Sequence, residues 1–287
     1  MGKAMRKESG SWTTTIKPKI GWFEIDLREL WHCRELVGLF VRRDFVAFYK
    51  QTILGPIWFL IQPLLTTLVF TIVFGKIAKI STDGLPPVLF YFSGTIIWSY
   101  FAENLQKTSD TFVTNAGLFG KVYFPRLTVP ISITIINLLS FAIHFSSFVV
   151  LLGYFALTGT PIRLSWHALT LPLLLLQMAA LGLGTGIIIS ALTTKYRDLR
   201  FLVGFGVQLW MYATPVVYPL STIPPRWRWV FTANPVAPVV ENFRHAFLGV
   251  GGVPVADTLA SLAITVSILL IGILLFNRVE KTFMDTV

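Results

Sequence analysis

Six long stretches of this chain contain no Asp, Glu, Lys or Arg, and this pattern constrains the fold more than any other feature. The stretches are residues 51–75, 86–102, 127–162, 164–194, 201–225 and 258–277. Crossing the hydrocarbon core of a bilayer takes about 20 residues of helix. Each stretch is therefore a candidate span, with residues 86–102 the tightest fit. The pattern predicts an all-α polytopic membrane protein with six transmembrane helices.

The distribution of basic residues predicts the orientation of these spans. Six spans place both termini on one side of the membrane, and that side holds 18 of the 24 Lys and Arg residues, against 6 on the other. Because basic residues are enriched on the cytoplasmic side, both termini are predicted to be cytoplasmic. Basic residues at membrane ends attract anionic headgroups, so the net charge of +10 indicates membrane lipids, and no nucleic acid, as partners.

Four regions follow one another along the chain. Residues 1–20 are polar and basic without periodicity, and are predicted to form a mobile cytoplasmic tail. Residues 21–50 repeat apolar and basic positions at helical spacing, which predicts an amphipathic interfacial helix; the alternative is a helix packed on a cytoplasmic partner. Residues 51–277 are the predicted six-span transmembrane domain, and residues 278–287 a cytoplasmic C-terminus.

The segment 218–255, which precedes the last stretch, fits neither a span nor a solvated loop. Pro and Gly interrupt it too often for a crossing helix, yet it is too apolar for a loop in water. We predict short re-entrant helices here that enter the outer leaflet and return. Glu241 and Arg244 in this segment are spaced i, i+3, which predicts either an ion pair that fixes an outer gate or an ordinary surface pair.

Three glycines, Gly182, Gly184 and Gly186, lie close together in the fourth stretch. Small residues at this spacing let helices approach one another closely in a membrane. We therefore predict close helix contacts within the subunit, with a dimer seam as the alternative.

Side chains suited to catalysis or metal binding are scarce. The four histidines lie in separate segments without the spacing of a metal site. The nearest phosphate-loop sequence, residues 115–122, has Asn115 where such a loop has its first Gly, and Val122 where it has Ser or Thr. We predict no catalytic residue, metal or cofactor in this chain, and expect any ATP and Mg to be bound by a separate ATPase.

Aromatic residues are abundant, with 24 Phe, 9 Trp and 8 Tyr. Their rings can stack on the C–H faces of sugars, so those inside spans are candidates to line a path for a glycan. The alternative is packing against lipid and neighbouring helices. The candidates are Trp58, Phe59, Phe70, Tyr91, Trp98, Trp210 and Tyr212.

A set of short motifs occurs in a fixed order along the chain. They are Arg43-Asp44, Tyr49–Trp58, Pro63-Leu64, Val73–Gly75, Asn115–Leu118, Lys121–Arg126, Pro130, Lys195–Leu199, Thr214–Tyr218, Asn234-Pro235 and Glu241–Arg244. In these motifs, over residues 40–280, the chain resembles the membrane (permease) subunit of type-2 ABC exporters for lipid-linked polysaccharide, the family of O-antigen, capsule and teichoic-acid transporters.

The resemblance implies a particular assembly in the bacterial inner membrane. Two copies of the six-span subunit would form a homodimer, joined by two copies of a cytoplasmic ABC ATPase that binds ATP and Mg. The implied substrate is a glycan on an undecaprenyl-diphosphate anchor. The first and fifth spans would line its path, and the re-entrant helices would flank the outer mouth. The chain itself would be a transport subunit and not an enzyme.

The resemblance also implies roles for individual residues. The candidates for docking the ATPase are Asn115, Leu118, Phe119, Lys121, Phe124 and Arg126, with a smaller second contact from Tyr196, Arg197 and Asp198. The outer-gate candidates are Tyr218, Asn234, Glu241 and Arg244. Arg42, Arg43 and Lys50 are candidates to bind the substrate diphosphate or lipid headgroups. For these basic residues the alternative is plain anchoring to anionic lipid.

Two other functions stay open at this point. In the same fold, the cargo could be a drug or a small lipid. In another class, the chain could be an integral membrane transferase acting on lipid-linked sugars. The best acidic candidates for such a transferase, Asp44, Glu103, Asp110 and Asp198, form no recognisable catalytic pair.

Overall fold

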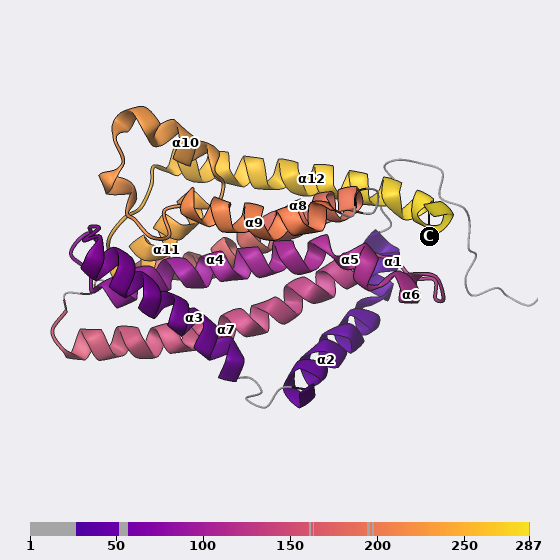
Figure 1. Cartoon of the computed structure of the whole chain (residues 1–287), viewed down its shortest axis with the longest axis horizontal. Helices are drawn as coiled ribbons and strands as arrows, with labels where there is room; N and C mark the ends of the chain where they lie inside the picture. Colours follow the sequence, from indigo (N-terminus) through magenta and orange to yellow (C-terminus); the bar gives the residue numbers. More distant parts are fainter. Residues whose placement is uncertain are drawn as a thin grey trace, which may run out of the picture.

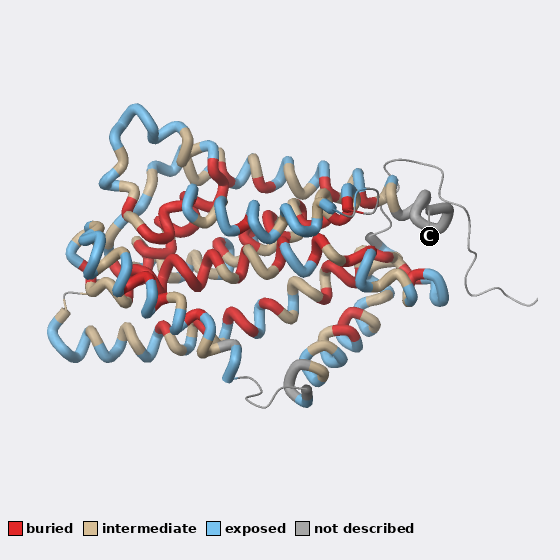
Figure 2. The backbone as a smooth tube through the Cα atoms, in the orientation of Figure 1, coloured by how far each residue is buried: buried red, intermediate tan, exposed pale blue. Residues whose placement is uncertain are grey.

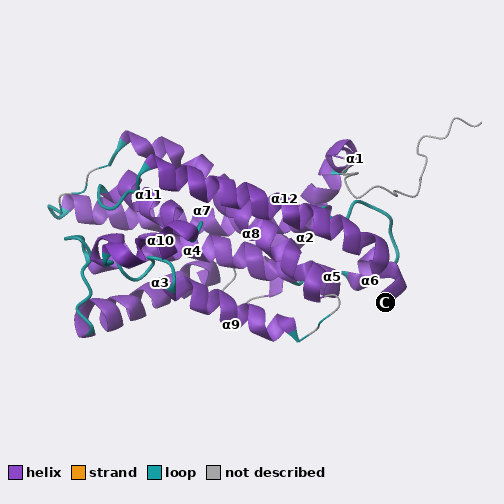
Figure 3. Cartoon of the chain, turned by 90° about the horizontal axis from the view of Figure 1, so that it is seen from above, coloured by secondary structure: helices purple, strands orange, loops and turns teal. Residues whose placement is uncertain are grey.

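The computed structural model describes residues 27–51, 57–160, 162, 164–193, 196 and 198–286, and within these ranges the secondary structure is helical with no strand (Figures 1 and 3). The predicted tail 1–20 and the first residues of the predicted interfacial helix lie outside the described residues. The all-α prediction is confirmed for the part of the chain that is described.

Each uncharged stretch corresponds to a helix that runs along the length of the bundle, and successive helices alternate in direction (Figure 1). These helices are α3 (Ile57–Phe70) with its π-helical continuation η1 (Thr71–Ile77), α4 (Pro87–Ser109), α7 (Thr128–Leu157), α8 (Leu171–Thr193) with the 3-10 turn η2 (Trp166–Thr170) before it, α9 (Leu199–Tyr212) and α12 (Val255–Thr286).

Shorter helices gather at the two ends of the bundle (Figure 1). At one end lie η3 (Leu220–Thr222), η4 (Pro225–Trp227), α10 (Arg228–Ala233) and α11 (Ala237–Leu248). At the other end, with the last turns of α12, lie α1 (Leu27–His32), α5 (Thr111–Thr114) and α6 (Ala116–Phe119). We call the first the outer end and the second the inner end, after the predicted orientation.

Four helices among the described residues are long and apolar enough to cross a membrane: Leu60–Ile77, Thr128–Leu157, Trp166–Thr193 and Val255–Val279. Helices α4 and α9 are not among them. The 14 residues of α9 extend about 21 Å, less than the hydrocarbon core of about 30 Å. Helix α4 has 23 residues but is more polar. Crossing by all six helices therefore stays a prediction.

Helix α4 can carry polar side chains because it lies at the centre of the bundle. It packs against α3, α7, α8, α9 and α11, and its residues from Leu89 to Trp98 are all buried. Figure 2 shows this buried track running through the middle of the molecule. A helix surrounded by other helices does not face lipid, so Ser, Thr and Asn side chains are tolerated where a neighbour satisfies them.

The three glycines of α8 make the close contacts that the sequence predicts. A Cβ atom on Gly182 would lie 2.7 Å from Asn104 Cβ of α4, and one on Gly186 would lie 2.6 Å from Thr108 Cβ of the same helix. A Cβ atom on Gly184 would lie 2.8 Å from the Leu269 Cα atom of α12. The glycines therefore join helices within one subunit, and the dimer-seam alternative is not needed to explain them.

Helix α2 (Arg34–Gln51) leaves the bundle at an angle (Figure 1). It buries Val37 and Phe40 against the inner end and exposes Leu39 and Phe45. The exposed apolar side chains are available to a membrane interface or to a partner protein, the two possibilities that the sequence left open. The position of α2 in a membrane interface stays a prediction.

Candidate functional site

The segment after α9 folds back on the outer end of the bundle and does not cross it (Figure 1). Short helices form here instead of one long span because Pro and Gly residues interrupt the helical backbone. Helix α11 is nearly all buried within the protein, although its sequence contains both Glu241 and Arg244. The segment thus forms the short helices predicted for it, while its depth in a bilayer stays a prediction.

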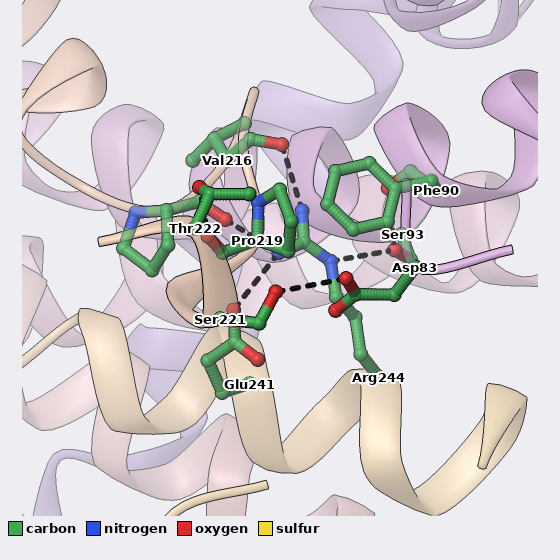
Figure 4. A network of polar contacts seen from close by, with 10 residues as sticks. Asp83, Phe90, Ser93, Val216, Pro219, Ser221, Thr222, Glu241 and Arg244 are labelled. Atoms are coloured by element: carbon green, nitrogen blue, oxygen red, sulfur yellow. Dashed lines mark hydrogen bonds and ion pairs between the residues drawn. The ribbon is translucent and has the colours of Figure 1, made fainter. Parts of the chain in front are cut away.

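A buried arginine is the centre of the outer end (Figure 4). The Arg244 side chain is 1% exposed. Its Nη2 atom donates a hydrogen bond to the Val216 carbonyl at 2.7 Å, and its Nη1 atom donates to the Pro215 carbonyl at 2.5 Å. Its Nε atom donates to Ser93 Oγ of α4 at 3.3 Å. The guanidinium carbon lies 3.8 Å from the centre of the Phe90 ring, a cation–π contact. One side chain therefore joins α11, α4 and the segment that directly follows α9, which we call the exit of α9.

Glu241 supplies the opposite charge. Its Oε1 atom accepts from Arg244 Nη1 at 3.1 Å, and its side chain is 2% exposed. The predicted i, i+3 ion pair is present, and it is a buried pair rather than a surface pair. Gly251, with φ of +76°, leaves room for it, since a Cβ atom there would lie 2.3 Å from Glu241 Oε2.

Asn234 holds the same exit of α9 from the other side. Its Nδ2 atom donates to the Thr214 hydroxyl at 2.9 Å and to the Ala213 carbonyl at 3.2 Å. Its Oδ1 atom accepts from the Trp210 indole at 3.1 Å. Residues 213–216 are therefore bound by two side chains, Asn234 on the first two residues and Arg244 on the last two. We call this four-residue segment with its two anchors the outer latch.

Tyr218 lies just beyond the outer latch. Its hydroxyl donates to the Tyr212 carbonyl at 2.9 Å. All four predicted outer-gate residues thus contact the exit of α9 or one another.

The neighbours of Arg244 on α4 are functional-site residues that the sequence did not reveal. Ser93 and Gly94 are adjacent on the face of α4 toward Arg244, and a Cβ atom on Gly94 would lie 2.7 Å from Arg244 Nη2 and 2.9 Å from the Val216 carbonyl oxygen. A Ser-Gly pair in the middle of the uncharged stretch 86–102 is the signal that was available. It could not have pointed to a residue 151 positions away.

Aromatic rings pack against one another at the inner end. Phe112 and Phe276 stack with ring centres 4.6 Å apart. Phe119 contacts Phe124 at 5.7 Å, and Phe124 contacts Phe40 of α2 at the same distance. Each of the five rings is buried. We call them the inner aromatic cluster.

This cluster divides the predicted ATPase-docking residues. Phe119 and Phe124 lie inside, and Arg126 is 9% exposed with its guanidinium carbon 5.4 Å from the Phe119 ring. Asn115 and Leu118 are half-buried, and Asn115 Nδ2 donates to the Thr111 carbonyl at 3.0 Å. Of the six residues, only Lys121 is fully on the surface.

The exposed part of this loop is the tip at residues 121–123. Val122 is 54% exposed and Tyr123 is 62% exposed. Both lie within the range 115–126 that the resemblance assigns to docking, and exposed aromatic side chains such as Tyr123 are enriched at protein interfaces. Docking of an ATPase here stays a prediction.

The predicted second docking contact lies near the start of α9. Tyr196 is exposed and Asp198 is exposed beside it, while Arg197 lies outside the described residues. Arg200 Nε contacts Asp110 Oδ1 at 2.8 Å and so joins α9 to the end of α4. This ion pair is half-exposed and is worth about 1 kcal/mol at most.

The predicted headgroup residues lie on α2. Arg42, Arg43 and Lys50 are all exposed. Arg43 Nε contacts Asp44 Oδ1 at 2.7 Å, and its guanidinium carbon lies 4.9 Å from the Phe40 ring. The three basic groups are therefore accessible to an anionic group, and their role in binding one stays a prediction.

The predicted path aromatics separate into two groups. Phe70, Tyr91 and Trp98 are buried in the bundle, where Phe70 contacts Tyr91 and Trp98 contacts the half-buried Trp210. Trp58 and Tyr212 are exposed. The side chain of Phe59 lies outside the described residues. In a single chain, the first group therefore packs the core, and only the second is available to line a path.

Two of the histidines, from separate segments of the sequence, lie close together in the structure. The rings of His167 and His245 lie 5.2 Å apart at the outer end, with Ser165 Oγ 2.8 Å from His167 Nδ1. No group of three or more metal-ligating side chains occurs among the described residues.

Comparison with known proteins shows which proteins this chain is similar to. Residues 35–248 match the family model for the ABC-2 type transporter. The O-antigen export system permease protein RfbA of Klebsiella pneumoniae is 27% identical over 253 residues, 88% of this chain and 94% of that protein. The protein of the same name from Myxococcus xanthus is 27% identical over 264 residues, 91% and 98%. The polysialic acid transport protein KpsM of Escherichia coli is 23% identical over 251 residues, 87% and 95%.

The family match covers well over half of the chain and contains the inner aromatic rings of α5 and α6, the outer latch and the Glu241–Arg244 pair. It also agrees with the resemblance found in the motifs of the sequence. The chain therefore belongs to the ABC-2 type transporter family.

Proposed function

We propose that this chain is the transmembrane subunit of an ATP-driven exporter that moves undecaprenyl-diphosphate-linked polysaccharide across the bacterial inner membrane. The observation that carries the proposal is similarity over nearly the full length to permeases whose names specify O-antigen export and polysialic acid transport. The bundle of long apolar helices supports a membrane location.

In this proposal all six lengthwise helices cross the bilayer, with both termini in the cytoplasm. The shortness of α9 is compatible with crossing because the outer latch continues it toward the outer end. The polarity of α4 is compatible because its neighbours shield it from lipid. The excess of Lys and Arg on the inner side supports the orientation.

Two copies of the chain form the channel in this proposal. Helices α3 and α9 lie toward the same side of the bundle in Figure 3, and Figure 1 shows them on either side of α4. Each exposes a row of apolar residues: Leu65, Leu68 and Val69 on α3, and Phe201, Leu202 and Phe205 on α9. This side supplies apolar area for a second copy, and Trp58 and Tyr212 lie on the same two helices. A pair of facing chains would enclose a path between them.

Two copies of a separate cytoplasmic ATPase supply the energy, with ATP and Mg bound by that partner. The exposed tip at residues 121–123 and the start of α9 are the proposed docking surfaces at the inner end. A rigid loop suits this role because it can transmit a movement of the ATPase to the transmembrane helices without deforming. The inner aromatic cluster packs against the loop and supports it on the side facing the bundle.

The experiment that tests the coupling is co-purification of this chain with a candidate ABC ATPase from the same organism, followed by measurement of ATP hydrolysis. The proposal predicts a stable complex whose hydrolysis rises severalfold with undecaprenyl-diphosphate-linked glycan and does not rise with free glycan. If the two proteins do not associate, the docking assignment is wrong. Stimulation by a drug or a small lipid alone would transfer the proposal to another cargo.

The diphosphate assignment has its own test. Replacing Arg42, Arg43 and Lys50 together by alanine should abolish stimulation by the lipid-linked glycan, because a diphosphate at the membrane surface needs cationic donors. Basal hydrolysis should be retained. Unchanged stimulation would leave these residues as lipid anchors only.

A further inference from the structure

A groove of about 200 Å³ lies between α2, α4 and α7, away from the outer latch and the docking tip. Figure 1 shows why it exists: α2 leaves the bundle at an angle to α7, and the two helices diverge like the sides of a wedge. One part of the groove carries the charged side chains Asp44 and Lys107. The rest is walled mainly by aliphatic side chains of α7: Ile133, Ile136, Leu139 and Ile143.

The apolar wall has the length of one lipid leaflet. From Ile133 to Ile143 the helix advances about 15 Å, which is half of the hydrocarbon core of about 30 Å. Helix α7 is one of the helices long and apolar enough to cross a membrane. Lys107 lies in the last turn of α4 at the inner end. The groove therefore begins near the inner membrane surface and extends along the hydrocarbon of the inner leaflet.

Lys107 is held in a fixed position. Its Nζ atom donates to Glu103 Oε2 at 2.8 Å and to Asn137 Oδ1 at 2.7 Å. Asn137 is itself fixed, because its Nδ2 atom donates to the buried Asn104 Oδ1 at 3.0 Å. An ammonium group has three N–H donors. Two are used by these partners, which leaves one for a ligand oxygen in the groove.

The charges around the groove favour a zwitterion over an anion. Lys107 is paired with Glu103, and Asp44 is paired with Arg43 at 2.7 Å, so the four formal charges cancel. A purely anionic headgroup would gain no net attraction and would meet the carboxylate of Asp44, which lines the groove together with Lys107. A headgroup with one phosphate and one ammonium can place the phosphate on Lys107 and the ammonium on Asp44.

We propose that this groove binds a membrane phospholipid of the phosphoethanolamine class, with its phosphate on Lys107, its ammonium on Asp44 and one acyl chain along α7. The lipid would fill the wedge and set the angle between α2 and the bundle. The proposal rests on embedding in a membrane and not on the identity of the transported cargo.

The test is lipid retention by the full-length chain, purified with its ATPase partner from nanodiscs containing equal amounts of phosphatidylethanolamine and phosphatidylglycerol with matched acyl chains. Native mass spectrometry counts the retained lipids. We expect phosphatidylethanolamine to be retained at least fivefold over phosphatidylglycerol. Equal retention of the two lipids would show an ordinary lipid annulus and overturn the proposal.

Matched variants locate the site. Leu139→Trp fills the groove, whereas Leu138→Trp places the same ring on the neighbouring exposed position outside it; Leu139 is 44% exposed and Leu138 is 41% exposed. Only the first should lower retention of phosphatidylethanolamine, by at least fivefold. An equal loss in both variants would contradict the proposal.

Two polar variants give a second readout that does not depend on a bulky residue. Lys107→Gln should lower retention, with Lys76→Gln on the exposed outer part of η1 as the control. Asp44→Asn should lower the preference for phosphatidylethanolamine over phosphatidylglycerol. In a separate arm, added undecaprenyl diphosphate that displaces phosphatidylethanolamine at equal concentration would make the groove a substrate site and overturn the assignment to a resident lipid.

Discussion

The two ends of the bundle are closed by different kinds of contact. At the outer end, Arg244, Glu241 and Asn234 form directional hydrogen bonds to a short segment of backbone. At the inner end, the inner aromatic cluster packs rings from α2, α12 and the loop between α4 and α7. Directional bonds hold one geometry and fail when a partner is removed, whereas ring packing tolerates small changes of shape.

This difference agrees with the proposed roles of the two ends. An outer mouth must keep one closed arrangement until it opens. A buried ion pair suits this requirement because it is either formed or broken. An inner docking loop must stay rigid through many cycles while its tip changes partners. Substitutions at the two ends should therefore differ in their effect on stability.

The largest loss of stability is expected for Arg244→Met. It leaves Glu241 buried without its partner, and breaking a buried ion pair in this way costs about 3–5 kcal/mol. Thermal unfolding of the purified protein in detergent, followed by intrinsic fluorescence, should show a marked fall in the unfolding temperature. The double variant Arg244→Met with Glu241→Leu should recover part of that loss, because no charge then remains unpaired. The exposed Arg228→Met serves as a control.

A smaller loss of stability is expected for Gly94→Ala. The added Cβ atom would lie 2.7 Å from Arg244 Nη2 and 2.9 Å from the Val216 carbonyl oxygen, both of which belong to fixed groups. Overpacking of this kind costs about 1–3 kcal/mol. The same unfolding measurement on Gly204→Ala, where nothing lies within 4 Å, should show no loss. An equal loss in both variants would show that the close contact with Arg244 does not explain the requirement for glycine at position 94.

At the inner end, Phe124→Leu is expected to have a milder effect than either outer variant. The side chain is buried among rings, and exchange of one large apolar residue for another usually costs less than about 1.5 kcal/mol. The unfolding temperature should fall only slightly. A loss as large as that of Arg244→Met would contradict the contrast between the two ends.

The smallest effect on folding is expected for Tyr123→Ala at the docking tip. Surface substitutions away from special features change stability by about 0.5 kcal/mol or less. Association with the ATPase, measured by titration of the purified partner, should nevertheless weaken at least fivefold. Tyr154→Ala is the matched control, since Tyr154 is 61% exposed but lies at the outer end of α7. If neither variant alters association, the tip is not the docking surface.

The sequence was sufficient for the positions of the long helices, because a missing charge over some 20 residues has one main physical cause, the avoidance of charge in hydrocarbon. It was sufficient too for the Glu241–Arg244 pair, because i and i+3 are neighbours on any helix. It could not give the other partners of Arg244. Ser93 and Val216 come from elements far away in the chain, and only the packing of α4 against α11 brings them together.

Which face of a span is covered was equally hidden in the sequence. Tyr91 and Trp58 both looked like aromatic residues within spans, yet Tyr91 is fully buried and Trp58 is 45% exposed. Phe119 and Phe124 looked like part of a docking surface, yet their rings support the loop from inside. Aromatic residues suit both situations, so residue type alone does not separate them.

Vectorial export of the glycan is the function proposed for this chain. Reconstitution tests it: proteoliposomes contain the chain with its ATPase partner, undecaprenyl-diphosphate-linked glycan and ATP are supplied on the side of the ATPase, and the glycan that becomes accessible on the opposite side is measured. We expect transfer that requires ATP, requires both proteins and is lost in Arg244→Met vesicles that still contain assembled complex. Glycan transfer that is independent of ATP, or its absence from an intact and hydrolysing complex, would show that the proposed function is wrong.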